Sequence, residues 1–400
     1  MEPFANHKIL YVSSIDVSIG NGPGVNEREF VEALHQALGP RAHFLIPKPE
    51  QDLASVRGDC FTFSKAHHQH HPLHFVNHVI SQMRIIDQLI SRFKPDLLIY
   101  RLDFLPLVQY YIALRHRIPY VIKALGQGGL RMQKRWLGNV LLPLNRWLLR
   151  SLMKGALGID AVSEYNVQFF IKEFCISPER ILWVDNAVNT DRFWPTPVQE
   201  ARHRLGLGHL APIVGYVGGS PTVRGGVQLV ELAPALLKRF PQLGIVIVGD
   251  DKNLRRLKWR ADKLGISEHC VFPGHVSFDL IPNYINSFDV CISLNLEAKM
   301  GETGMSELKV RQYLACGKPV VCGPGSNNFV GTENLGSIVS PDELPAVQKE
   351  IERWLLMTPK ETEELRSRAV AYVTANLSVK ISLRKRFEFW DRLLVAQSSG

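Results

Sequence analysis

Residues 301–321 read GETGMSELKVRQYLACGKPVV, and this stretch predicts a loop, a helix and a strand in immediate succession. Ser306 is a residue type that favours the N-cap of a helix. Gly317 favours the end of that helix, and Pro319 opens an apolar run with the composition of a strand. A helix that leads directly into a short apolar strand is the repeating unit of an α/β domain with a parallel sheet.

The same alternation of short β-rich runs and longer amphipathic stretches continues along almost the whole chain, in two series. Such alternation is typical of parallel sheets covered by helices on both faces. We therefore predict an α/β protein with two doubly wound, Rossmann-like domains. The expected strands are Ile9–Val12, His43–Ile46, Asp96–Tyr100, Tyr120–Lys123 and Ile159–Val162 in the first series, and Ile213–Val217, Ile245–Val248, Cys270–Phe272, Val290–Leu294 and Pro319–Val321 in the second.

The chain has 400 residues, which is enough for two or three ordinary domains. The segment 186–210 is polar and lacks a strand pattern, so we place the boundary there. The expected division is 1–188 for the N-terminal domain and 189–378 for the C-terminal domain. Residues 379–400 read as a helix that packs back on the N-terminal domain. Since parallel sheets bind ligands beyond the carboxyl ends of their strands, we expect an interdomain cleft to hold the ligand.

The composition excludes several classes of protein. Hydrophobic residues make up 46% of the chain and charged residues 21%, which excludes disordered, collagen-like and coiled-coil proteins. No apolar run is long enough to cross a membrane, and the N-terminus lacks a signal-peptide pattern, so we expect a cytoplasmic protein. The net charge of +9 is compatible with anionic small molecules, anionic lipids or nucleic acid, and does not choose among them.

Two residue types that bind metals occur without a metal-binding pattern. The six cysteines show no CxxC spacing, so we expect free thiols rather than a disulfide or zinc framework. Histidines gather in residues 67–71, and this run predicts a solvated surface loop, with a metal site as the alternative.

Glycine-rich turns follow the first expected strand of each series. Residues 20–24 have the spacing GxGxG before a helix expected from residue 26 to residue 38, and no acidic residue ends the second strand. This is a poor dinucleotide fingerprint, and it leaves either a close approach to a phosphate or sugar or a tight turn alone. In the second series Gly218 and Gly219 precede Arg224, a residue type suited to holding a diphosphate, although an ordinary exposed arginine is the alternative.

The helix expected within 301–321 carries a further candidate site. The free amides of Glu307 and Leu308 at its start would attract an anion. Lys309 and Gln312 are three residues apart and share a face. Lys309 suits a phosphate, and Gln312 suits a ribose or sugar hydroxyl.

Four stretches together resemble a known family, the retaining glycosyltransferases of family four. The resemblance extends over roughly residues 8–395, and the last two stretches are its more specific part. The stretches are GPGVNE at 22–27, NAVNTDRF at 186–193, GGSPTVRG at 218–225 and LKVRQYLACGKPVV at 308–321.

The resemblance implies a GT-B fold of two facing Rossmann-like domains and a hexosyl- or related glycosyltransferase. The donor would be a nucleotide sugar, most often UDP- or GDP-linked, held by the second domain. The acceptor would be a saccharide or lipid-linked glycan on the first domain, in polysaccharide or glycolipid synthesis. The family needs no metal or other cofactor, and the donor diphosphate itself is thought to take the acceptor's proton.

The resemblance assigns roles to residues that the motifs already single out. Arg224 and Lys309 would form the catalytic clamp on the leaving diphosphate. The donor-binding candidates are Gly218, Gly219, Ser306, Glu307, Leu308, Gln312 and Glu302. The candidates on the acceptor side or in the cleft are Gly22, Gly24, Asn26, Lys123 and Gln127.

Three departures from the family pattern keep other functions open. Gln312 and Gly304 stand where the family often has two glutamates, with Glu302 near the first position. Gly219 stands where an arginine is usual, and the loop 123–129 lacks a histidine that Lys123 or Gln127 would have to replace. A non-catalytic binding or partner subunit and a nucleotide-sugar epimerase are therefore the alternatives.

Residues 130–155 carry six basic residues and no acidic one, with a leucine stripe on one face of the expected helix. A basic amphipathic helix of this kind can lie on an anionic bilayer. We expect either a peripheral association with the inner face of the membrane or leucines that pack into the domain core. Nucleic-acid binding has no recognised motif here.

Overall fold

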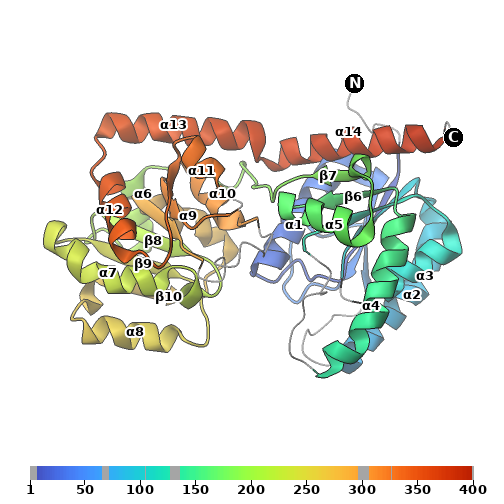
Figure 1. Ribbon diagram of the computed structural model, residues 1–400, viewed down its shortest axis with the longest axis horizontal. Helices are drawn as coiled ribbons and strands as arrows, with labels where there is room; N and C mark the ends of the chain where they lie inside the picture. The colour runs from blue at the N-terminus through green and yellow to red at the C-terminus, as the bar shows by residue number, and fades with distance from the viewer. Residues whose placement is uncertain are drawn as a thin grey trace. The chain divides into compact units, whose positions relative to one another are not determined.

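The computed structural model describes residues 7–64, 72–103, 105–126, 136–295, 306–325 and 327–398. Its contacts divide the chain into two compact units, which are coloured along the chain in Figure 1. The chain passes between the units four times, because a short segment near the N-terminus is assigned to the second unit and the C-terminal segment returns to the first. The first unit comprises Met1–Ile19, Pro23–Asp185 and Val379–Gly400, and the second comprises Gly20–Gly22 and Asn186–Ser378.

In the described residues, the first unit has a seven-stranded sheet in the order β3-β2-β1-β4-β5-β6-β7, and every pairing is parallel. The strand order reverses between β1 and β4, as in doubly wound sheets. The strands are β1 (Ile9–Val12), β2 (Ala42–Pro47), β3 (Phe61–Ser64), β4 (Leu97–Arg101), β5 (Tyr120–Ala124), β6 (Gly158–Ala161) and β7 (Ile181–Trp183).

Helices cover both faces of this sheet because successive strand residues point to opposite faces. Leu10 of β1 packs with α2, α3, α4 and α5 on one face, whereas Tyr11 packs with α1 and α14 on the other. The C-terminal helix α14 is fixed by Trp390, which is fully buried. The helices are α1 (Gly22–Leu38), α2 (Pro72–Phe93), α3 (Leu107–His116), α4 (Trp136–Gly155), α5 (Glu164–Phe174) and α14 (Val379–Ser398).

The second unit repeats this architecture. Within the described ranges its sheet has six parallel strands in the order β10-β9-β8-β11-β12-β13. The strands are β8 (Ile213–Val217), β9 (Gly244–Val248), β10 (Cys270–Gly274), β11 (Val290–Ser293), β12 (Val320–Cys322) and β13 (Gly336–Ile338). The helices are α6 (Val198–Leu205), α7 (Gly226–Arg239), α8 (Leu254–Lys263), α9 (Ile281–Ser287), α10 (Leu308–Ala315), α11 (Phe329–Thr332), α12 (Leu344–Leu355) and α13 (Pro359–Asn376).

Two separate apolar clusters bind helices to the two faces of the second sheet. One joins α7, α8 and α12 to the sheet, and the other joins α9, α10 and α13 to it. The predicted fold class, two doubly wound α/β domains, is confirmed by these two sheets. The ten expected strands all form; two keep their expected bounds, and the bounds of the other eight shift by one or two residues.

Local differences from the sequence prediction have physical reasons. Three strands were not predicted: β3, β7 and β13 are only three or four residues long and lie at sheet edges. At β7 every residue is at least partly exposed, so its apolar pattern is weak. The first helix begins at Gly22, so Gly22 and Gly24 belong to a helical turn rather than to a loop before the helix.

None of the helices described here is long and apolar enough to cross a bilayer. All six cysteines are free thiols, as predicted, and three of them are buried. Among the residues with a described structure, no three histidine, cysteine or acidic side chains form a group suited to a metal ion. The histidines of 67–71 lie outside the described residues.

Candidate functional site

The turn after β8 brings two strand ends into contact. Gly218 has a φ of +140°, and a Cβ there would lie 3.1 Å from Cε of Lys309. Gly249, which follows β9, has a φ of +125°, and its Cβ would lie 1.9 Å from the carbonyl oxygen of Gly218. Only glycine fits at both positions, because a side chain would meet backbone at Gly249 and the lysine at Gly218. The carboxyl ends of β8 and β9 therefore form a closely packed floor beside Lys309.

Lys309 lies in the first turn of α10 and is buried. Its Nζ donates to the hydroxyl of Tyr216 at 3.3 Å and lies 4.8 Å from the centre of the same ring. Burial lowers the pKa of Lys309 to about 8; Glu307 opposes this shift, and Arg224 adds to it. Across the described ranges, no carboxylate forms an ion pair with this ammonium group. A buried cation with only a neutral hydroxyl as partner is suited to an anionic ligand.

Arg224 is the second cation of this site. It follows a short 3₁₀ turn (Pro221–Val223) and is half-buried. Its carbonyl oxygen accepts from the amide of Leu294 at 3.1 Å, which ties the backbone to the end of β11. Its Nε is buried without a hydrogen-bond partner. The charge of Arg224 contributes to the lowered pKa of Lys309, and an anion bound by both would relieve this repulsion.

Glu307 anchors a polar network that the sequence did not reveal. One of its carboxylate oxygens, Oε2, accepts from Ser293 Oγ at 2.7 Å and from Asn327 Nδ2 at 3.1 Å. Arg311, fully buried, donates to Asn327 Oδ1 at 2.7 Å and to the carbonyl oxygen of Glu307 at 3.1 Å. Oε1 of Glu307 is buried without a partner. In the sequence, a polar residue at the end of an apolar strand, Ser293, was the one available indication of this network. The fold brings Asn327 and Arg311 to Glu307, and no local motif indicates these contacts.

The prediction that Ser306 caps α10 is wrong. The helix begins at Leu308, and Glu307 occupies the N-cap position without a capping side-chain bond. Ser306 Oγ instead accepts from the amide of Asn186 at 3.1 Å, and the Ser306 carbonyl accepts from Asn186 Nδ2 at 2.6 Å. The hydroxyl is therefore used to join two distant segments of the second unit.

The remaining donor-side candidates are placed as follows. Gln312 is buried one turn after Lys309 in α10, and Leu308 opens that helix half-exposed. Gly219 is exposed, and a Cβ there would meet nothing within 4 Å, so no contact requires a glycine at this position. Its carbonyl oxygen accepts from the Tyr216 hydroxyl at 2.7 Å. Glu302 lies outside the described residues.

In the first unit, Lys123 is part of a buried ion cluster. Its Nζ lies 3.0 Å from Glu27 Oε2, and Arg101 Nη1 lies 2.6 Å from the same oxygen. Tyr11 donates its hydroxyl to the other oxygen of Glu27. Burial lowers the pKa of Lys123 to about 8, and despite burial the two cations hold the pKa of Glu27 at about 2. Lys123 is thus enclosed by its own partners.

The other acceptor-side candidates differ in their surroundings. A Cβ at Gly24 would lie 2.3 Å from the carbonyl oxygen of Ile19, so the start of α1 packs tightly on the preceding loop. Gly22 has open space around it, and Asn26 is half-buried in the second turn of α1. Gln127 lies outside the described residues.

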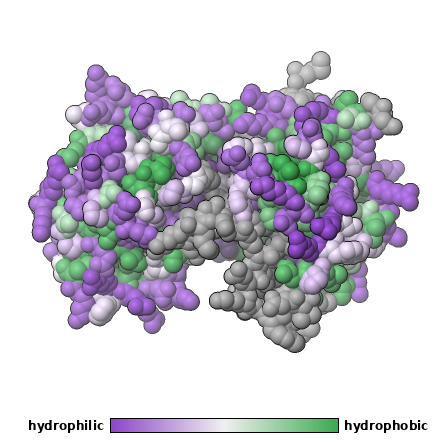
Figure 2. Space-filling view, in the orientation of Figure 1, coloured by the Kyte–Doolittle hydropathy of each residue, from purple (hydrophilic) through white to green (hydrophobic). Residues whose placement is uncertain are grey.

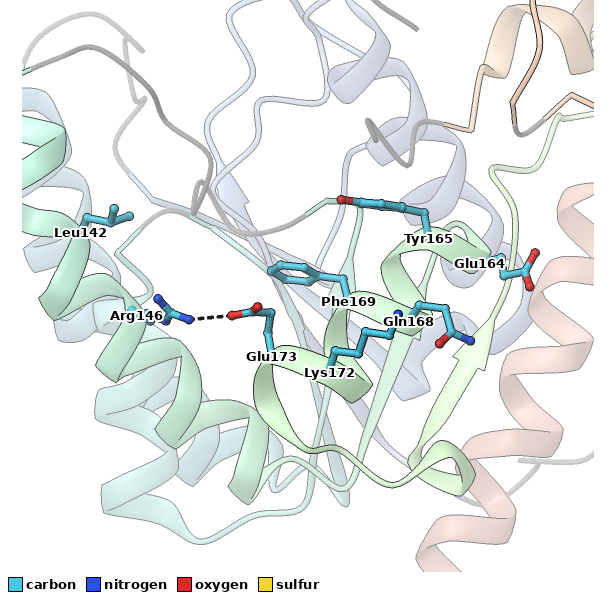
Figure 3. A pocket seen from close by; sticks show the side chains of 8 residues that line it. All are labelled: Leu142, Arg146, Glu164, Tyr165, Gln168, Phe169, Lys172 and Glu173. Atoms are coloured by element: carbon cyan, nitrogen blue, oxygen red, sulfur yellow. Dashed lines mark hydrogen bonds and ion pairs between the residues drawn. The ribbon is translucent and has the colours of Figure 1, made fainter. Parts of the chain in front are cut away.

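A groove of about 820 Å³ lies between α4 and α5 in the first unit. Figure 3 shows Phe169 and Glu173 of α5 directed toward Leu142 and Arg146 of α4. Arg146 Nη2 pairs with Glu173 Oε2 at 2.6 Å across the groove. Tyr165, one turn before Phe169, adds a second aromatic ring, and this spacing was the signal available in the sequence. The lining residues are Leu142, Arg146, Glu164, Tyr165, Gln168, Phe169, Lys172 and Glu173.

The leucine stripe of α4 is divided between core and surface. Leu148 and Leu152 are 2% exposed and belong to the core of the first unit, as the second of the two alternatives predicted. Leu144 is 46% exposed and Trp147 is 55% exposed, with its ring 5.3 Å from that of Tyr110. The last turns of α4 pack against the sheet through Leu149, Leu152 and Met153.

The fold agrees closely with solved structures. Sucrose-phosphate synthase from Thermosynechococcus elongatus superposes with a TM-score of 0.72 at 17% identity, covering 97% of this chain and all of that one. HepE from Anabaena, solved in complex with UDP, gives 0.68 at 16% identity, covering 96% of this chain and all of that one. At such identities the likeness establishes the fold alone. The class of the protein is accordingly a two-domain α/β protein of the GT-B fold, with a cationic site at the carboxyl edge of its second sheet.

Family models identify the chain more closely. The model for Glycosyl transferases group 1 matches residues 198–372, and that for Glycosyltransferase Family 4 matches residues 21–192. The chain belongs to these glycosyltransferases. The GDP-mannose-dependent alpha-(1-6)-phosphatidylinositol monomannoside mannosyltransferase of Mycolicibacterium smegmatis is 30% identical over 219 residues, which is 52% of this chain and 56% of that one. The chain thus spans about half the length of the curated relatives it matches.

Proposed function

We propose that the protein transfers a sugar from a nucleotide-sugar donor, UDP- or GDP-linked, to a hydroxyl of an acceptor. The observation that carries this proposal is the pair of cations beside Gly218. The charges of Lys309 and Arg224 repel each other, and in the described ranges neither forms an ion pair with a carboxylate. A diphosphate would supply the missing negative charge in a site that is already organised to receive it.

In the proposed reaction the two cations act on the leaving group. The bond between the sugar's anomeric carbon and the diphosphate breaks, and negative charge builds on the diphosphate oxygen. Arg224 and Lys309 stabilise that charge, and the Tyr216 hydroxyl orients the ammonium group. A new bond forms from the anomeric carbon to the acceptor oxygen, whose proton passes to the diphosphate. We propose retention of configuration and no metal requirement, following the family pattern.

The proposed acceptor is a saccharide or a lipid-linked glycan. The mannosyltransferase relative carries a phosphatidylinositol acceptor in its name, which supports a lipid-linked acceptor here. The groove between α4 and α5 offers aromatic rings beside charged groups, a combination suited to a sugar. We further propose a cytoplasmic protein whose α4, through exposed Leu144 and Trp147, contacts the inner face of the membrane.

Thermal unfolding with UDP, GDP, ADP, CDP or dTDP, without metal, tests the donor site. A ligand at 100 times its dissociation constant stabilises the fold by about 2.7 kcal/mol, enough to raise the melting temperature by several degrees. We expect one nucleoside diphosphate to do so, and the Arg224→Ala, Lys309→Ala double variant to lose the effect. No shift with any nucleotide would contradict the proposal and favour the non-catalytic partner subunit.

The matching nucleotide sugar then separates the two catalytic alternatives. We expect slow or no turnover until an acceptor with a free hydroxyl is added. Release of free nucleotide and an epimerised sugar without an acceptor would identify an epimerase instead.

For the membrane contact, Leu144→Ser with Trp147→Ser should reduce binding to anionic vesicles, while leaving the nucleotide-induced shift unchanged.

A further inference from the structure

Helix α8 (Leu254–Lys263) is held on the second unit by one apolar face. Leu254, Leu257 and Ala261 are buried in the same core cluster as α7 and α12. Arg260, at the edge of this face, pairs with Glu231 through two hydrogen bonds of 2.7 and 2.8 Å. These contacts fix the rotation of the helix, so its opposite face is presented to solvent in a defined orientation.

The opposite face is strongly basic. Asp262 is the one exposed acid within 252–263, and its carboxylate accepts from Ser267 Oγ. Hydrophilic side chains gather over α8 in the space-filling view (Figure 2). Within the described ranges none of the exposed cations of this face forms an ion pair. We call it the basic face; its cations are Lys252, Arg255, Arg256 and Lys263, with Lys258 at its edge, where Nζ lies 6.0 Å from the centre of the Phe272 ring.

One large aromatic side chain stands among these cations. Trp259 is 58% exposed, and the Nζ of Lys263 lies 5.7 Å from the centre of its ring. An exposed indole is costly in water but favourable at a bilayer interface, where its ring meets acyl chains and its N–H meets water. Flexible lysine and arginine stems can lie along the same interface and reach anionic headgroups.

We propose that the basic face of α8, with Trp259 at its centre, binds the surface of an anionic membrane. This contact lies in the other unit from the one proposed for α4, and it does not depend on the identity of the donor. The partner is identified by charge complementarity and by the indole, which a purely electrostatic contact would not need. Each cation removed near such a surface weakens binding about fivefold.

Vesicle flotation of the 400-residue chain tests the proposal. One set of vesicles contains phosphatidylcholine alone. The other contains phosphatidylcholine with about 30% phosphatidylglycerol, which supplies anionic headgroups. We expect binding to the anionic vesicles only, and its loss at high salt. The test variant neutralises four cations of the basic face, and the control neutralises four exposed cations elsewhere. The test substitutions are Arg255→Gln, Arg256→Gln, Lys258→Gln and Lys263→Gln, and the controls are Lys349→Gln, Lys360→Gln, Arg384→Gln and Lys385→Gln.

The test variant should lose affinity by about 100-fold or more, and the control by little. Trp259→Ala should weaken binding while keeping its dependence on salt. Nucleotide-induced thermal shifts should be unchanged in every variant, which separates this proposal from the donor site. The proposal is overturned if the parent protein ignores anionic vesicles, if test and control variants bind alike, or if the basic face binds nucleic acid while vesicle binding is unaffected.

Discussion

Two buried lysines, Lys123 in the first unit and Lys309 in the second, have similar surroundings, but we assign a structural role to the first and a ligand-binding role to the second. Both lie near the carboxyl edge of a parallel sheet, and both have an ammonium group near an aromatic ring. Burial lowers the pKa of each to about 8. The difference is the direct partner: Lys123 has the carboxylate of Glu27 at 3.0 Å, whereas the hydrogen bond described for Lys309 is to the Tyr216 hydroxyl at 3.3 Å.

The comparison teaches that burial alone does not mark a functional lysine. In the first unit the direct pair with Glu27 offsets part of the desolvation cost of Lys123 and holds the ammonium group inside the fold, so the residue serves structure. In the second unit Glu307 offsets part of this cost from a distance, but no carboxylate among the described residues forms an ion pair with Lys309, so the site can accept an anion. A depressed pKa becomes informative about binding when the compensating charge is missing.

The largest expected effect is on catalysis by the second unit. Replacing both cations, Arg224→Ala with Lys309→Ala, removes two groups that stabilise the leaving diphosphate. Loss of one such donor typically reduces the rate by about 10²- to 10³-fold, so the double variant should lose at least about 10³-fold in kcat. Steady-state transfer assays with the nucleotide sugar found by the thermal screen measure this effect.

The matched control is Lys238→Ala with Arg239→Ala, at the end of α7. Arg239 forms a surface pair with Glu352 at 2.7 Å, which contributes little to stability. The control should therefore retain activity within a few-fold. Full activity in the Arg224, Lys309 variant would show that these cations do not act on the leaving group.

The second effect concerns stability and should separate the two lysines. Lys123→Met leaves Glu27 with fewer partners in the core, and breaking a buried pair costs about 3–5 kcal/mol. Since Arg101 still pairs with Glu27, we expect about 3 kcal/mol in the free energy of unfolding. Lys309→Met removes a buried cation that forms no ion pair with a described carboxylate, and it should be neutral or stabilising. Urea unfolding of both variants measures the difference, and equal destabilisation would refute the distinction drawn between them.

The sequence predicts the fold well because apolar strands alternate with amphipathic helices. Buried runs such as Ile213–Val217 and Ile245–Val248 are continuous enough to identify as strands of a parallel sheet. The strand β7 is not recognisable because its three residues lie at an edge and Trp183 is exposed. Edge strands receive support from one neighbour only, so their residues carry less of the apolar pattern.

The candidate site is predictable only where a motif specifies a local conformation. Gly218, Arg224 and Lys309 follow from such motifs, and the structure brings Gly218 and Arg224 to Lys309. The contacts of Glu307 with Asn327 and Ser293 join residues 14 and 20 positions away, which local patterns do not determine. The pairing of Lys123 with Glu27 joins residues 96 apart, so its structural role could not be distinguished from a ligand-binding one.

The smallest expected effect is the dependence of donor binding on pH. Below about pH 8 Lys309 is already charged, so a diphosphate binds without taking up a proton. Above that pH the lysine must be protonated on binding, and the affinity should fall by up to about tenfold per pH unit until the pKa of the bound state is reached. Lys309→Met should bind more weakly and show no such fall.

Calorimetric titration with the nucleoside diphosphate measures this dependence. The pH range should extend about one unit to either side of the Lys309 pKa, from about pH 7 to about pH 9.5. The stability of the free protein should change with pH in the opposite direction to the affinity. Because the Lys309 pKa is lowered in the folded state, the unfolded chain binds more protons from about pH 8 to about pH 10.5, and the free energy of unfolding rises across that range. Lys123 contributes the same rise, and Lys309→Met therefore removes only part of it. The fall in affinity belongs to Lys309 alone, because Lys123 is enclosed with Glu27. A fall that survived in Lys309→Met would assign the titrating group elsewhere.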